Sequence, residues 1–257
     1  MDAASYLASA VFLWRIRRRD RREPDASPRG KLWPELREGL SYVLGHRYLR
    51  PLTLVTGAWN LFASVGFGIS LVYFVRPLDL SPEVVGVVLM VGGGGSVVGA
   101  LVAGRAAARF GIGPTMVWPG IAASVMFVLV PLAPRESPEP FIVASVLLGT
   151  FFGMLFNVTQ LTFRQAITPE RLQGRMNAVV RLMYWGPQPA GLALGGVLAA
   201  AIGLRPTLFF SAGAATLCFL PLAAHPIRKL RAMPGTERGP SPGPAVVPVP
   251  APHEPDA

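Results

Sequence analysis

Charged residues are missing from six long stretches of this chain of 257 residues. Each stretch contains no Asp, Glu, Lys or Arg and is between 21 and 25 residues long. The stretches are Pro51–Val75, Val84–Gly104, Phe110–Pro134, Pro140–Phe163, Leu182–Leu204 and Pro206–Ile227. A helix rises about 1.5 Å per residue, so each is long enough to cross a hydrocarbon core of roughly 30 Å. Because they lack the alternation of barrel strands, they predict an all-α polytopic membrane bundle of six transmembrane helices.

Residues that commonly build catalytic and metal sites are also scarce. Cys218 is the one cysteine, which excludes an intramolecular disulfide. The three histidines, His46, His225 and His253, are far apart and do not have the spacing of metal ligands. The stretches contain no Asp or Glu for a proton relay, and the motifs of ATPases, serine hydrolases and zinc proteases do not occur. The sequence therefore predicts no metal, no cofactor and no enzyme activity.

The charges that remain predict the orientation of the spans. The net charge is +10, and the loops between the first five spans sum to −1, +2, −1 and +3 in order. Basic loops lie on the cytoplasmic side by the positive-inside rule, so an even number of spans places both termini in the cytoplasm. We therefore expect a multi-pass protein of the cell (inner) membrane. This topology accounts for the basic charge, and no nucleic-acid partner is expected.

The N-terminal residues 1–14 have an unusual pattern. The apolar run Ala3–Trp14 is too short to span a bilayer and is followed by six arginines within residues 15–22. A signal peptide would place its charges before the apolar run, not after it. The pattern predicts the cytoplasmic end of a preceding span whose outer half is missing, and an interfacial helix is the alternative.

Three further segments follow along the chain. Residues 15–50 are a basic cytoplasmic linker, which ends in an amphipathic helix from Pro34 to Arg50. Residues 51–227 hold the six spans. Residues 228–257 are rich in Pro and Gly and are expected to be a disordered cytoplasmic tail.

A few polar side chains interrupt the apolar spans. Asn157, Gln160 and Arg164 follow one another at intervals of about one turn, so they share a helix face. The candidates for a substrate cavity are Asn60, Asn157, Gln160 and Gln188, and those for a cytoplasmic gate are Arg164, Arg175 and Arg181. Polar groups in lipid cost free energy, which favours a lining role. Satisfied interhelical hydrogen bonds, or arginines at the membrane interface, are the alternative.

Glycines recur four residues apart in two of the spans. Gly95 and Gly99 lie in the second span, and Gly191 and Gly195 lie in the fifth. Small residues at this spacing let helix backbones approach closely, which predicts helix-packing sites. A flexible helix in a moving transporter is the other interpretation.

Two loops carry a family resemblance. One segment runs from Gly104 through Arg105 and Arg109 to Gly111, and it resembles the cytoplasmic signature of the major facilitator superfamily. Ala108 stands where the signature has Asp, and Gly113 stands where it has a basic residue. The loop from 164 to 177, RQAITPERLQGRMN, is similar to one in bacterial multidrug and siderophore exporters of that superfamily. The resemblance covers about residues 1–230.

The resemblance implies a fold and a function. Such transporters have two six-span halves around a central substrate site, so this chain would be the C-terminal half of a secondary active exporter. Its partners would be a small hydrophobic or amphiphilic substrate, the lipid bilayer and a missing N-terminal half, with the proton gradient as one candidate driving force. Arg105 and Arg109 would contact lipid headgroups or helix ends. The alternative is a self-contained six-span protein that acts as a partner-binding subunit, a channel or a homodimeric transporter.

Overall fold

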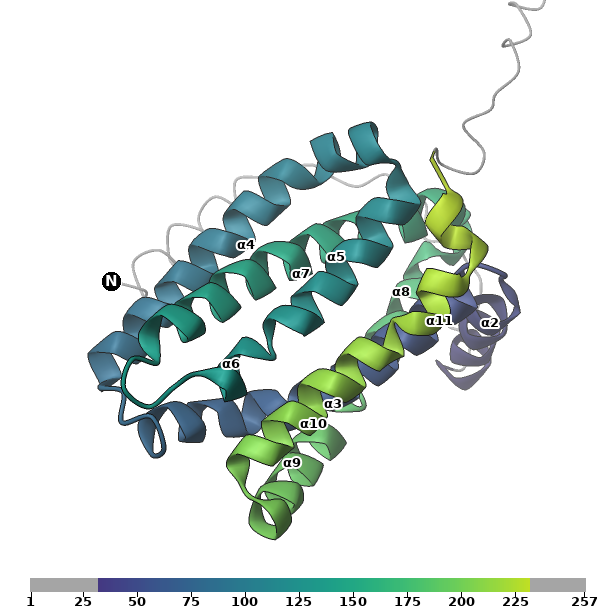
Figure 1. Ribbon diagram of the computed structural model, residues 1–257. Helices are drawn as coiled ribbons and strands as arrows, with labels where there is room; N and C mark the ends of the chain where they lie inside the picture. Colours follow the sequence, from purple (N-terminus) through teal and green to yellow (C-terminus); the bar gives the residue numbers. More distant parts are fainter. Residues whose placement is uncertain (1–31, 232–257) are drawn as a thin grey trace, which may run out of the picture. The chain divides into compact units, whose positions relative to one another are not determined.

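The computed structural model describes residues 32–231 of the chain (Figure 1). The predicted partial span at residues 1–14, the linker as far as residue 31 and the tail from residue 232 lie outside the described residues. The chain divides into two units, Met1–Glu35 and Leu36–Ala257, and all packing described below lies within the second.

The described residues form helices joined by short turns and contain no strand, which confirms the predicted all-α bundle. The elements are α2 (Leu32–Gly45), α3 (Leu49–Val75), α4 (Pro82–Phe110), α5 (Ile112–Met126), α6 (Leu129–Leu132), α7 (Glu139–Ile167), α8 (Glu170–Trp185), α9 (Gln188–Ile202), α10 (Leu204–Cys218), α11 (Leu220–Ala224) and a 3₁₀ turn at Pro226–Lys229. The predicted amphipathic helix is α2, and it ends at Gly45, five residues earlier than expected.

In the described part of the chain, five helical segments are long and apolar enough to cross a membrane. They are α3, α4, α5 with α6, α7, and α10 with α11. The structure differs from the prediction in the fifth stretch, where α8 ends at Trp185 and α9 begins at Gln188. Pro187 and Pro189 interrupt the helix because proline has no N–H to donate. The Gly191 N–H donates to the Pro187 carbonyl, so α9 resumes directly after this local break.

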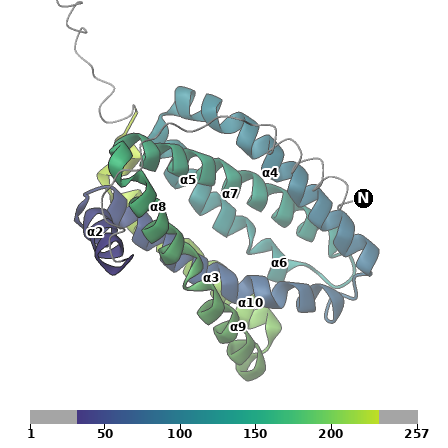
Figure 2. The same cartoon turned by 180° about the vertical axis from the view of Figure 1, so that it is seen from behind.

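The long helices pack in two groups of three. In one group α3 packs against α9 and α10, and in the other α7 packs against α4 and α5 (Figure 1). Figure 2 shows the same two groups from behind. Each group combines helices from both halves of the chain, because α3, α4 and α5 precede α7, α9 and α10. This arrangement packs the first three of these helices against the last three.

Glycines make close contacts in both groups. The glycines and the carbonyl oxygens they approach are Gly95 with Leu147, Gly99 with Phe151, Gly191 with Leu61, and Gly195 with Val65. A Cβ atom at Gly95 or at Gly195 would lie 2.5 Å from the facing oxygen, nearer than real Cβ atoms come. The structure thus places the four predicted packing glycines at α4–α7 and α3–α9 contacts.

The two halves of the bundle repeat one another in sequence and backbone geometry. Gly111 and Gly203 each end one helix and begin the next, with φ of 90° and 88°. Glycine adopts this region without a steric penalty. Each is followed by a helix of 15 residues, α5 or α10. Around these turns Gly99, Gly104, Gly111, Pro114 and Thr115 recur at the same spacing as Gly191, Gly196, Gly203, Pro206 and Thr207.

A shared apolar core joins the two groups. Leu52 of α3, Met116 of α5 and Phe163 of α7 are fully buried in one cluster, and Phe219 between α10 and α11 packs with them. The Phe219 ring makes an edge contact with Phe156 at 5.4 Å between centroids. This core fixes α3 and α7 relative to each other, and these helices carry most of the candidate site.

Candidate functional site

A buried polar cluster lies where α7 meets α8. The Tyr184 hydroxyl of α8 donates a hydrogen bond of 2.8 Å to the Gln160 side-chain oxygen. The Arg164 guanidinium lies over the Tyr184 ring, 5.2 Å from its centroid. The side chains of Gln160 and Arg164 are on the buried face of α7, with only 1% and 5% of each residue exposed. We refer to these three residues as the Arg164 cluster.

Arg164 is a buried charge that has no acidic partner in the described part of the chain. Its Nε and Nη1 atoms are buried and have no hydrogen-bond partner within the described residues. Arginine does not lose its proton in proteins, so the charge persists. A cation–π contact contributes about 2 kcal/mol when desolvated, whereas the effective penalty for burying an ion is several kcal/mol. An anion or water supplied from outside the described residues would lower this cost.

The other predicted cavity residues lie apart from the cluster. Asn60 donates its side-chain N–H to the Thr56 carbonyl of its own helix at 3.0 Å, which is a local contact. Asn157 is exposed, and Gln188 is half-buried at the start of α9. Within the described residues, the side-chain amides of Asn157 and Gln188 have no hydrogen-bond partner. The structure therefore brings Gln160 and Arg164 together but not the four predicted amides.

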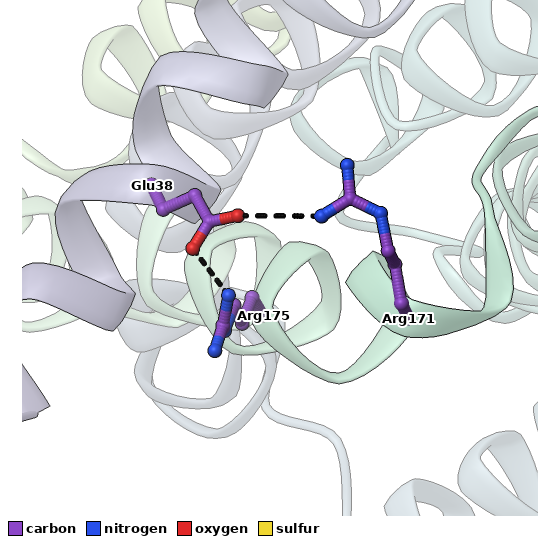
Figure 3. Close-up of polar contacts among 3 residues, drawn as sticks. All are labelled: Glu38, Arg171 and Arg175. Atoms are coloured by element: carbon purple, nitrogen blue, oxygen red, sulfur yellow. Dashed lines mark hydrogen bonds and ion pairs between the residues drawn. The ribbon is translucent and has the colours of Figure 1, made fainter. Parts of the chain in front are cut away.

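The three predicted gate arginines occupy different surroundings. Arg164 is buried, whereas Arg181 is exposed. Arg175 of α8 forms an ion pair with Glu38 of α2, and the Arg171 guanidinium lies 3.7 Å from the same carboxylate (Figure 3). Figure 3 shows the Glu38 carboxylate between the two guanidinium groups. Arg175 thus helps to hold α2 on α8.

The amphipathic helix α2 packs on protein rather than lying free on lipid. Val43 is fully buried against Val179 and Met176 of α8. A Cβ atom at Gly39 would lie 2.9 Å from the Arg175 carbonyl oxygen, so the two backbones are close. The predicted apolar face is therefore used only in part, since Leu40 remains more than one third exposed.

A pocket of about 640 Å³ lies beside the start of α3, and no pattern in the sequence predicted it. It is lined by residues of the α2–α3 turn, the first turns of α3 and the α10–α11 end, including His46, Arg47, Cys218 and His225. His46 and His225 are far apart in sequence yet border the same space. Burial lowers the pKa of both imidazoles, and the charge of Arg47 lowers each pKa further.

The comparisons with known proteins agree with this architecture. A family model described as the Major Facilitator Superfamily matches residues 1–185 and, in a second placement, residues 60–250. The chain belongs to the major facilitator superfamily. Membership points to a multi-pass secondary transporter of small molecules rather than an enzyme. Neither the curated proteins nor the solved structures give a match to the chain.

The segment that resembles the signature of the superfamily forms the last turns of α4 and the junction with α5 at Gly111. Arg105 and Arg109 are exposed, and the Arg109 guanidinium lies 5.6 Å from the centroid of the neighbouring Phe110 ring. Gly104 has open space where a side chain would point.

The sequence also departs from the superfamily pattern at Gly113, near the start of α5, and the structure gives the reason. The Gly113 N–H donates to the Leu230 carbonyl at 2.8 Å, and a Cβ atom there would collide with the Ile227 carbonyl oxygen. The 3₁₀ turn after α11 therefore occupies the space that a basic side chain would need. This contact joins residues more than a hundred positions apart, so the loop sequence alone does not predict it.

Proposed function

We propose that this transporter chain is the C-terminal half of a secondary active exporter of small hydrophobic or amphiphilic molecules. The observation that carries the proposal is the position of Asn157 within α7. It lies on a span that continues to Ile167, and its amide is exposed without a partner in the described structure.

An exposed amide at this depth does not suit a lipid-facing surface. An unsatisfied polar group in hydrocarbon costs several kcal/mol. In contrast, the exposed residues Leu89, Met90 and Leu101 of α4 are apolar, as a lipid-facing surface requires. We infer that the face of α7 with Asn157 borders water and substrate, and that the Arg164 cluster lies behind this cavity wall.

A second half is part of the proposal because the spans described here carry no ionisable carboxylate beyond their first turns. Glu83 and Glu139 are in the first turns of α4 and α7, and no other acidic residue occurs in the membrane-crossing segments. Proton coupling in transporters relies on carboxylates or histidines inside the membrane. We infer that an N-terminal six-span half supplies this group and the opposite cavity wall, with proton influx driving export.

Reconstitution tests the proposal. The chain is purified into proteoliposomes alone, and in parallel with a candidate N-terminal half encoded upstream of it. Under an imposed proton gradient, transport of the fluorescent amphiphile ethidium is then measured. We expect no transport by the chain alone and gradient-dependent transport by the pair. Robust transport by the chain alone would favour a homodimeric transporter, and transport by the pair without a gradient would overturn proton coupling.

A further inference from the structure

The pocket at the start of α3 has a polar end and an apolar end. Arg47 and Arg50 border it where α3 begins, and His225 borders it just after α11 ends. Leu54 and Ala58 continue the lining one and two turns further along α3. At 1.5 Å per residue, Ala58 lies about 12 Å deeper than Arg50. The pocket therefore runs from the charged start of α3 along this apolar, membrane-crossing helix.

The polar end carries positive charge that has no acidic partner among residues 32–231. Arg47 and Arg50 are both exposed, and neither forms an ion pair with an acidic residue in this part of the chain. The Arg47 guanidinium lies 4.9 Å from the centroid of the Tyr48 ring, which holds it near the pocket mouth. Two guanidinium groups at one mouth favour an anion, and arginine matches phosphate oxygens in a bidentate geometry.

We propose that this pocket binds an anionic phospholipid of the cytoplasmic leaflet. Arg47 and Arg50 hold the headgroup phosphate, and an acyl chain lies along Leu54 and Ala58. Anionic lipids concentrate in the cytoplasmic leaflet, where basic residues near the surface attract them. A free phosphate ion would leave the apolar end of the pocket empty, whereas a phospholipid fills both ends.

The single cysteine of the chain provides a direct measurement. Cys218 lines the same pocket, so a bound lipid shields its thiol from alkylation. The purified full chain is placed in neutral detergent, and the rate of Cys218 labelling by N-ethylmaleimide is followed by mass spectrometry. Dioleoylphosphatidylglycerol is then added, with dioleoylphosphatidylcholine and inorganic phosphate as separate arms. At about ten times the Kd of the lipid, labelling should slow about tenfold, because only the empty pocket reacts.

Matched variants separate the pocket from general surface charge. Replacing Arg47 and Arg50 by Gln should abolish the protection by phosphatidylglycerol. Replacing Arg105 and Arg109 by Gln, which removes two exposed arginines from the end of α4, should leave it intact. Both double variants change exposed side chains, so folding is checked by a monodisperse elution profile and an unchanged Tm.

Three outcomes would overturn the proposal. Equal protection by phosphatidylcholine would show that the arginines do not select the ligand. Protection by inorganic phosphate alone would show an anion site without a lipid chain. Faster Cys218 labelling after removal of residues 232–257, in the absence of lipid, would show that the tail fills the pocket. None of these measurements involves transport, so the lipid site can fail while the proposed exporter function stands.

Discussion

At the scale of single residues, the two amides on α7 have different surroundings although they are one turn apart. Gln160 is buried and accepts the Tyr184 hydrogen bond, whereas Asn157 is exposed. Sequence spacing predicted both on one face of the helix. It could not show that α8 covers one of them, because that depends on where Tyr184 packs.

This difference gives a prediction for alanine variants of the two amides. Gln160→Ala leaves the Tyr184 hydroxyl without its acceptor, and interhelical hydrogen bonds in membrane proteins contribute about 0.6 kcal/mol, at most about 1.7. We expect a lower Tm for Gln160→Ala and an unchanged Tm for Asn157→Ala. In the reconstituted pair, Asn157→Ala should change ethidium transport. A lower Tm for Asn157→Ala with normal transport would contradict a cavity-lining role.

His46 and His225 act as local caps through the same ring atom. The His46 Nδ1 atom accepts from the backbone N–H groups of Tyr48 and Leu49 at 3.2 and 3.3 Å, at the start of α3. The His225 Nδ1 atom accepts from the Ile227 N–H at 3.3 Å. Each imidazole must be neutral to accept at Nδ1. Burial and Arg47 lower both pKa values in the same direction.

A pH dependence of stability follows from these caps. Both histidines have a folded-state pKa below the ordinary value of about 6.5, so the unfolded chain binds more protons between the two values. The contribution of the two neutral imidazoles to stability is fully present above a pH of about 6.5. It is lost as the pH falls through the lowered pKa values. The Tm in detergent should therefore fall between pH 8 and pH 5. The fall should be smaller in the double variant His46→Gln, His225→Gln, and an identical fall would contradict the prediction.

At the scale of helices, glycine positions decide which contacts are close. Within the run of four glycines in α4, a Cβ atom at Gly95 would meet α7, whereas one at Gly94 would meet nothing within 4 Å. The same contrast holds in α9 between Gly195 and Gly196. The spacing of four predicted the contact positions, but it did not identify the partner helices.

Each contact glycine has an open neighbour that serves as a control. We expect Gly95→Val and Gly195→Val to lower stability by about 1 to 3 kcal/mol, because overpacking forces helix backbones apart. Gly94→Val and Gly196→Val should leave stability nearly unchanged. The measurement is the Tm of each purified variant at one detergent concentration. Equal losses within a pair would mean that backbone freedom, and not close packing, explains these glycines.

The helix boundaries were predictable to different degrees. The ends of α3 and α7 lie within a few residues of the predicted spans, because charged residues flank them. The interruption before α9 was not predicted, although the Pro-Gln-Pro sequence at 187–189 was visible. Hydropathy does not register a missing N–H, so a stretch can be uniformly apolar and still contain a helix break.

At the scale of the whole molecule, the sequence predicted the family but neither the repeat nor the pocket. The repeat around Gly111 and Gly203 was recognised from the structure, where both turns have a positive φ. The lipid pocket depends on the approach of the α2–α3 turn to the α10–α11 end. Such long-range proximity leaves no local pattern, which is why two distant histidines gave no sign of sharing a site.

The orientation of the whole chain can be tested with single cysteines on a Cys218→Ala background. The basic loops predict that Ala108 and Gly174 face the cytoplasm and that Arg76 and Ser137 face outward. All four positions are exposed in the structure, so a maleimide can reach each of them on its own side. A membrane-impermeant maleimide added to intact cells should label Arg76→Cys and Ser137→Cys, and should label Ala108→Cys and Gly174→Cys only after lysis. Labelling of Ala108→Cys or Gly174→Cys in intact cells would reverse the orientation. The proposed lipid pocket, placed at the cytoplasmic leaflet by the same charge rule, would then face the opposite leaflet.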